Sequence, residues 1–205
     1  MNSLPVAYFI IGITVITSFA AFQNADLINK LICYPFKIKR DKEYWRLATY
    51  GLIHADMMHL FFNMFSFYFF GRQIEYAFIM IYGNALVFPL YYLAALVVSV
   101  LPSFYKQQNN YNYRSLGASG AVSAVIFSSI LLDPWNKVYV YFIGIPGILF
   151  AVLYTWYSHR MNQQGQDNIG HDAHLHGALF GLIFPVVTKP YLAIDFFKQL
   201  THPVF

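Results

Sequence analysis

The segment 117-GASG-120 places one hydroxyl group, that of Ser119, at the start of a helix-length run without charges. Serine attacks a carbonyl only when an adjacent base takes its proton. His174 can act as that base, because it begins a second apolar run and shares a helix face with Gly177 and Gly181. Paired glycines let another helix approach closely, and the small residues of the first segment suit that approach. The two segments therefore predict a serine–histidine pair capable of acyl transfer.

Two more polar side chains, His59 and Asn63, are four residues apart and lie on one face of a predicted helix. Both can donate hydrogen bonds to the oxyanion that forms when Ser119 attacks a carbonyl. The backbone N–H of Ser119 is a third donor, because the first N–H groups of a helix have no partner within it. An alternative interpretation is that His59 and Asn63 each satisfy a neighbouring helix backbone.

No carboxylate lies where it would orient the base. Asp172 is two residues from His174, on the opposite side of a helix, and Asp56 belongs to a different apolar segment. We therefore predict a dyad of Ser119 and His174 rather than a triad. Ser123, one turn after Ser119, is expected to pack or to form a local hydrogen bond.

A metal site is a competing interpretation of three histidines, His54, His59 and His174. Histidine suits zinc. However, His54 and His59 are five residues apart, which separates them by about 140° around a helix, and the H-E-x-x-H spacing is absent. We therefore expect no metal and no other cofactor.

The composition indicates a chain that is embedded in lipid. Its 205 residues are 58% hydrophobic and only 11% charged, whereas a soluble domain has about 25% charged residues. A core of this size cannot hide so much apolar surface from water. The net charge of +4 is not gathered in one long basic run, which argues against nucleic-acid binding. The single cysteine, Cys33, excludes an internal disulfide.

The apolar runs predict an all-α polytopic membrane protein with six spans in a single domain over residues 1–205. The predicted spans are about 4–22, 50–71, 80–101, 117–132, 137–157 and 173–188. A membrane helix needs roughly 20 residues, so the fourth and sixth spans are short. Their polar or small starts indicate loops that re-enter the bilayer beside a water-filled cavity. The first span is expected to be an uncleaved anchor.

The Lys and Arg residues are unevenly divided between the two sides of the membrane in this topology. Six spans put both termini on one side and the loops 23–49, 102–116 and 158–172 on the other. The loop side holds nine of the 13 Lys and Arg residues. The positive-inside rule would place that side in the cytoplasm.

Several motifs, in chain order from Trp45 to Gly181, resemble those of the rhomboid intramembrane serine proteases of the basic six-helix type. The matching patterns are W-R at Trp45-Arg46, H-x4-H-x3-N in 54-HADMMHLFFN-63, G-x3-E at Gly71 and Glu75, G-x-S-G in 117-GASG-120, and A-H-x2-G-x3-G from Ala173 to Gly181. A lone G-x-S-G is weak evidence, but this order of motifs is specific.

The resemblance implies a role for each matching residue. Ser119 would be the nucleophile and His174 the general base, and His59, Asn63 and the Ser119 N–H would form the oxyanion hole. The residues implied to be structural supports are Trp45, Arg46, His54, Glu75, Gly177 and Gly181. The first loop would lie partly in the outer leaflet, the 158–172 loop would cap the site, and Phe62 and Trp156 would flank a side entrance for substrate.

The resemblance also implies an activity and a location. The chain would cleave single-pass transmembrane proteins near the outer face of a bacterial inner membrane, with both termini in the cytoplasm. This orientation is opposite to the one that the Lys and Arg count favours, and we follow the resemblance.

Two positions depart from the family pattern. Ser123 stands four residues after Ser119, where many relatives have an aromatic residue that stacks on the histidine, so His174 is expected to be held less rigidly. Ile79 stands where relatives often have glycine. One alternative function is a rhomboid-like binding or chaperone module that engages membrane segments without cutting them. Another is a transporter, which an internal repeat would favour.

Overall fold

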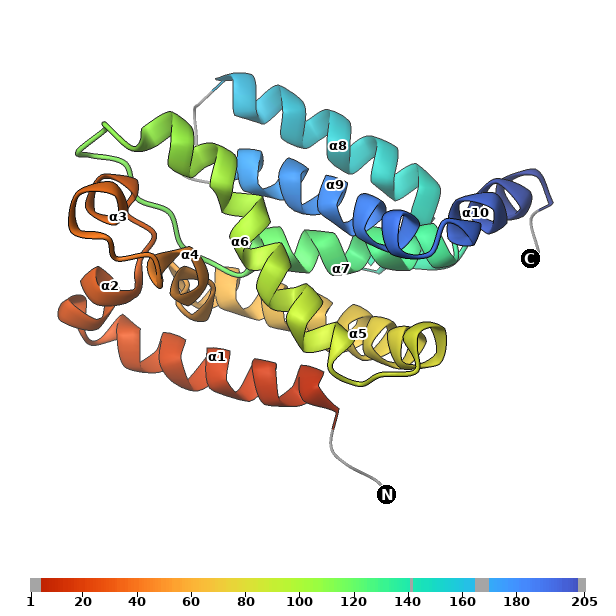
Figure 1. The fold of residues 1–205 in the computed structure, drawn as a ribbon, viewed down its shortest axis with the longest axis horizontal. Coiled ribbons are helices and arrows are strands. Elements are labelled where there is room, and N and C mark those ends of the chain that lie inside the picture. Colours follow the sequence, from red (N-terminus) through yellow and green to blue (C-terminus); the bar gives the residue numbers. More distant parts are fainter. Residues whose placement is uncertain (1–4, 141, 165–169, 203–205) are drawn as a thin grey trace.

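The computed structural model describes residues 5–140, 142–164 and 170–202, which form a bundle of helices (Figure 1). The elements are α1 (Val6–Phe22), α2 (Ala25–Leu31), α3 (Pro35–Asp41), α4 (Arg46–Thr49), a 3-10 turn (Tyr50–Leu52), α5 (Met57–Tyr82), α6 (Val87–Gln107), α7 (Ser119–Leu132), β1 (Lys137–Val140), β2 (Ile143–Pro146), α8 (Gly147–Gln164), α9 (His171–Thr188) and α10 (Tyr191–Thr201).

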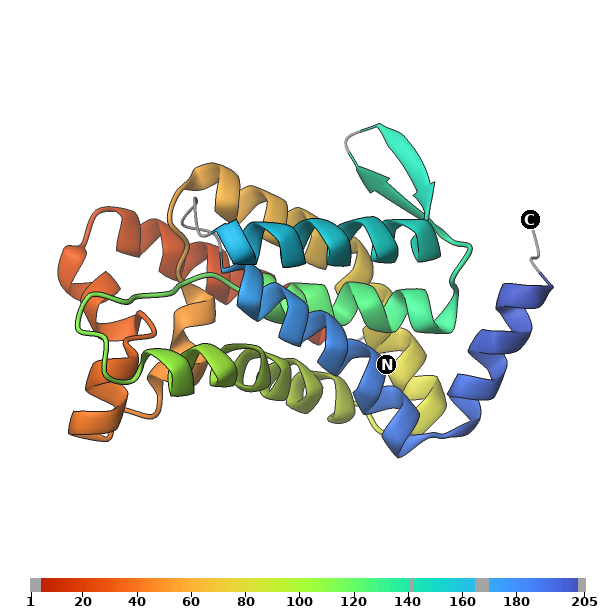
Figure 2. The ribbon, with the colours of Figure 1, turned by 90° about the horizontal axis from the view of Figure 1, so that it is seen from above.

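Helix α7 is the centre of the bundle. It packs against α5, α6, α8 and α9, and every residue from Gly120 to Leu131 is buried. A helix that is apolar or small on all sides is suited to such a position. Figure 2 shows the segment after α6 running inward, so that α7 begins part-way along the bundle.

The backbones of α7 and α9 are in direct contact. A Cβ atom added to Gly177 would overlap the backbone of Gly120, and one added to Gly181 would overlap the backbone of Ala124. Only glycine permits this approach, as the spacing of the two glycines predicted.

Helix α5 differs from its predicted bounds of 50–71, and the predicted connection at 72–79 is wrong. The carboxylate of Asp56 accepts a hydrogen bond of 2.8 Å from the backbone N–H of His59 and so caps the start of α5. Gly83, with φ of 68°, ends the helix in the left-handed region that favours glycine. Helix α6 therefore begins at Val87 rather than at residue 80.

The predicted helix over 137–157 is wrong in its first half. Residues 137–140 and 143–146 form an antiparallel hairpin in which Lys137 pairs with Pro146 and Val140 with Ile143. This segment is rich in β-branched and aromatic residues, which favour strands over helices. Helix α8 starts only at Gly147, and the hairpin is the exception to the all-α architecture among the described residues.

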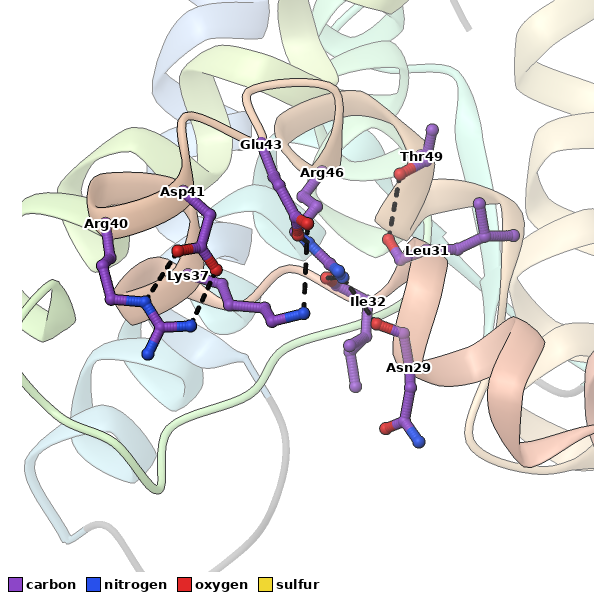
Figure 3. Close-up of polar contacts among 9 residues, drawn as sticks. All are labelled: Asn29, Leu31, Ile32, Lys37, Arg40, Asp41, Glu43, Arg46 and Thr49. Carbon is purple, nitrogen blue, oxygen red and sulfur yellow. Dashed lines mark hydrogen bonds and ion pairs between the residues drawn. The ribbon is translucent and has the colours of Figure 1, made fainter.

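The first loop, 23–49, folds around the buried side chain of Arg46 (Figure 3). Nη1 of Arg46 donates to the backbone oxygens of Asn29 at 2.6 Å and Ile32 at 3.0 Å, and Nε donates to the Glu43 carboxylate. The residue is only 2% exposed, and a buried cation is tolerated when partners of this kind surround it. Trp45, in contrast, is 51% exposed.

This loop also holds the segment that leads to α7. Cys33 and Ser115 exchange two backbone hydrogen bonds of 3.0 and 3.1 Å, and the N–H of Gly117 donates to the oxygen of Tyr50 at 3.0 Å. The start of α7 is thus fixed to residues far away in the sequence.

The number of membrane spans stays a prediction. By length and composition, α6 is the one helix in the described part of the chain that could cross a membrane alone, and α9 with α10, bent by 115°, would count as a second. Helices α1 and α7 are apolar but shorter. The outer surface is nevertheless rich in exposed apolar side chains, such as Phe9 and Ile16 on α1 and Phe61 and Phe69 on α5.

The thiol of Cys33 tests the packing of the first loop. Burial raises its pKa to about 12, so at pH 8 only about one thiol in ten thousand is ionised, and the thiolate is the reactive form. We expect N-ethylmaleimide at pH 8 to leave the folded protein unmodified and to label it fully after denaturation, as measured by mass spectrometry. Rapid labelling of the folded protein would contradict this packing.

The contact between α7 and α9 predicts the effect of Gly177→Ala. The added methyl group has no space against the backbone of Gly120, and overpacking of this kind typically costs about 1–3 kcal/mol. We expect a clearly lower melting temperature in detergent. Gly12→Ala in α1 is the matched control, because a Cβ atom there meets nothing within 4 Å. Equal melting temperatures for the two variants would refute the close contact.

Candidate active site

Ser119 is the first residue of α7 and is partly exposed, whereas the residues that follow it are buried. The first N–H groups of a helix have no partner within it, and the helix dipole favours negative charge there. The position therefore suits a side chain next to which an oxyanion forms.

The two glycines beside Ser119 each have a structural reason. Gly117 has φ of 109°, and a Cβ atom there would lie 2.6 Å from Cε1 and 2.9 Å from Nε2 of His59. A Cβ atom on Gly120 would overlap the Ser99 side chain and approach the oxygen of Ala173 to 3.2 Å. The G-x-S-G pattern thus lets α5, α6 and α9 come close to the nucleophile candidate.

His174 lies in the first turn of α9, next to this contact. Ala173 touches Gly120 on one side of it, and Gly177 touches Gly120 one turn later. The structure therefore brings the part of α9 that carries His174 to the start of α7, the helix approach that the glycine spacing predicted.

Two rings that sequence reasoning missed contact His174. The ring of Tyr154 on α8 stacks on the imidazole, with centroids 6.1 Å apart and planes 25° apart. His171 meets the imidazole edge-on, with centroids 5.7 Å apart. Ser123 supplies no ring to His174, and the aromatic neighbour comes instead from another helix, so the expectation that His174 is held less rigidly stays a prediction. The sequence could have indicated only the His171 contact, because His171 and His174 are three residues apart and so share a helix face.

His54 connects α1 to the start of α7. Its Nε2 accepts a hydrogen bond of 3.3 Å from the N–H of Ala118, and its Nδ1 lies 3.0 Å from Oγ of Ser18. Because Nε2 accepts, the proton belongs on Nδ1, which donates to Ser18. Ser18 in turn donates to the oxygen of Leu52 at 2.9 Å. His54 therefore contacts the residue just before Ser119.

His59 and Asn63 lie on α5, and the ring of His59 lies against Gly117 before the start of α7. The rings of His59 and His54 meet edge-on, with centroids 4.9 Å apart. Nδ2 of Asn63 donates to the oxygen of His59 at 2.9 Å, and Asn63 is buried. The amide nitrogen of Asn63 has two N–H groups, and this hydrogen bond uses one of them, so the second can serve an oxyanion.

Two acidic residues, Glu75 and Asp172, form hydrogen bonds with groups other than Ser119 and His174. The carboxylate of Glu75 accepts hydrogen bonds from the N–H groups of Val6 at 2.7 Å and Ala7 at 2.9 Å and so caps α1. Asp172 accepts a hydrogen bond of 2.8 Å from Oγ of Ser103 and lies 3.4 Å from Nδ1 of His176. These contacts turn the Asp172 carboxylate toward α6.

The remaining candidates lie near the surface. Trp156 is 60% exposed and lines a surface groove together with Phe127 and Leu182. Phe62 is half-exposed on α5. Among the described residues, no three His, Cys, Asp or Glu side chains form a group that could hold a metal ion.

Comparison with known proteins reveals the relationship of this chain. A family model described as the rhomboid domain matches residues 41–191. The rhomboid protease GlpG of Haemophilus influenzae is 26% identical over 160 residues, which cover 78% of this chain and 77% of that protein.

Two longer relatives match as well. RHOMBOID-like protein 12, mitochondrial, of Arabidopsis thaliana is 31% identical over 67% of this chain and 44% of its own length. The rhomboid protease GluP of Bacillus subtilis is 27% identical over 84% of this chain and 33% of its own length. This chain thus spans less than half the length of these two relatives. The family match, residues 41–191, includes both Ser119 and His174. The chain belongs to the rhomboid family of integral membrane proteins.

Proposed function

We propose that the chain is an intramembrane serine endopeptidase in which Ser119 is the nucleophile and His174 the general base. The observation that carries this proposal is the backbone contact between α7 and α9 at Gly120 and Gly177, which adjoins both residues. Two relatives are themselves named rhomboid proteases, which supports the activity.

The chemistry proceeds in two steps. His174 takes the proton of Ser119 Oγ while the oxygen attacks the scissile carbonyl, and the protonated imidazole then gives that proton to the leaving amine. A water molecule next attacks the acyl-enzyme with His174 again as base, and the ester bond to Ser119 breaks. Tyr154 and His171 hold the imidazole by ring contacts, so the dyad needs no carboxylate to orient it.

The oxyanion of each tetrahedral intermediate is stabilised by donors at the start of α7. The N–H of Ser119 has no partner within the helix. His59 presents Nε2 toward Gly117, and Asn63 contributes the amide N–H that its bond to the oxygen of His59 leaves unused. Loss of one such donor typically costs about 10²–10³ in rate.

The substrates that fit this site are single-pass transmembrane proteins. The exposed apolar side chains on α1 and α5 would face lipid, and six spans would place Ser119 below the membrane surface beside a water-filled cavity. We propose that the cleaved bond lies near the outer face of a bacterial inner membrane, with both termini in the cytoplasm. Trp156 lines the groove beside α8 where such a segment would approach.

Cleavage of a single-pass model substrate in proteoliposomes tests this proposal. We expect the wild-type protein to cut the substrate, and Ser119→Ala and His174→Ala to abolish cutting, because either change removes a group that takes part in bond formation. Ser129→Ala is the matched control. It removes a buried serine of the same helix that bonds to Gln73, away from Ser119, and should leave cleavage intact.

Cleavage that survives in Ser119→Ala would contradict the assignment of the nucleophile. A wild-type protein that binds the substrate without cutting it would instead favour a rhomboid-like binding or chaperone module.

A further inference from the structure

Tyr154 on α8 contacts His174 directly and is linked to Ser119 through Ser123. Its ring stacks on the imidazole of His174, with centroids 6.1 Å apart. Its hydroxyl oxygen lies 2.6 Å from Oγ of Ser123, and Ser123 donates to the backbone oxygen of Ser119 at 2.8 Å. One side chain therefore touches the base directly and the nucleophile through one serine.

The direction of these hydrogen bonds follows from the number of protons. The Ser123 hydroxyl has one hydrogen, and the backbone oxygen of Ser119 receives it. Tyr154 must then donate to Ser123, because a hydroxyl has a single proton to give and can still accept. Two hydrogen bonds in series in an apolar core strengthen each other.

The Tyr154 ring is itself fixed in place. It stacks on Phe150, with centroids 5.5 Å apart, and packs against Phe127 of α7 at 5.7 Å. Aromatic pairs of this kind favour particular orientations of the rings. The orientation of Tyr154 is thus set by two rings that do not take part in the chemistry.

We propose that Tyr154 is a positioning residue that holds His174 and Ser119 in one reactive arrangement. The ring sets the plane of the imidazole, and the hydroxyl fixes the first turn of α7 through Ser123. Ser123 therefore accepts a hydrogen bond from Tyr154 on another helix, and Tyr154 supplies the ring beside His174 that Ser123 cannot. This inference rests on the proposed function, because it assigns Tyr154 a role in the same reaction.

The test measures kcat and KM of the purified protein for a single-pass substrate in proteoliposomes. Misplacement of a reacting group by 1 Å can cost about 10²-fold in rate, so Tyr154→Ala should lower kcat by about that factor and leave KM almost unchanged. Tyr154→Phe keeps the ring and should lower kcat only about fivefold, the value of one hydrogen bond.

The double variant Tyr154→Ala with Ser123→Tyr supplies an aromatic ring from α7 in the space that Tyr154 leaves. We expect it to recover about tenfold of the lost kcat, since a ring again lies beside His174. The melting temperature is measured alongside, because a ring that only refills the cavity would restore stability without restoring kcat. If Tyr154→Ala fails to fold, Tyr154→Phe and this double variant still decide the question.

Tyr91→Phe is the matched control. The Tyr91 hydroxyl bonds to Ser128 at 2.7 Å, and Ser128 donates to the backbone oxygen of Gly181 at 2.7 Å, so this change removes a hydroxyl from an equivalent chain that does not touch His174. We expect a similar loss of melting temperature in both tyrosine-to-phenylalanine variants and a loss of kcat only at Tyr154.

Two outcomes would overturn the inference alone, with the wild type active: unchanged kcat in Tyr154→Phe, or equal kcat in the variants Tyr154→Phe and Tyr91→Phe. A wild-type protein that neither cuts substrate nor reacts with a fluorophosphonate would overturn the proposed function and this inference together.

Discussion

The close backbone contact between α7 and α9 sets the relative position of Ser119 and His174, the two residues between which the proposed chemistry moves a proton. Gly177 and Gly181 bring α9 against Gly120 and Ala124 with no side chain between them. Ser119 starts one helix beside this contact, and His174 lies in the first turn of the other. Since helices are stiff, a shift of either backbone would move both residues relative to each other. The small residues therefore serve geometry as well as packing.

The supports around this contact reach the start of α7 from distant parts of the chain. His54 links α1 to Ala118, and the strand-like pairing of Cys33 with Ser115 ties the first loop to the segment before Gly117. Arg46 holds that loop together by binding three of its groups. The bond from Ala118 to His54 and that from Arg46 to the oxygen of Ile32 are buried, so breaking either leaves polar groups without partners in an apolar interior. Motif residues such as Arg46 and His54 thus hold the backbone around the candidate site in place and need not take part in the chemistry.

The sequence was most informative where residue spacing fixes geometry within one helix. The shared face of His174, Gly177 and Gly181 predicted the helix contact, and the bounds of α7 agree with the apolar run that begins at residue 117. Contacts between helices could not be read from spacing. Tyr154 reaches His174 from α8, and neither residue's neighbours in sequence indicate it. Residues 137–140 and 143–146 were misassigned because hydrophobicity alone does not separate a strand from a membrane helix.

Reaction with a fluorophosphonate tests most directly whether Ser119 is an activated nucleophile, because the probe needs no matching substrate. Oγ of an activated serine attacks the phosphorus, and fluoride leaves. Peptide mass spectrometry of the membrane-embedded protein should locate a single adduct on Ser119, and His174→Ala should remove it. An adduct on another serine, or undiminished labelling of Ser119 in His174→Ala, would contradict a dyad formed by the approach of α9 to α7.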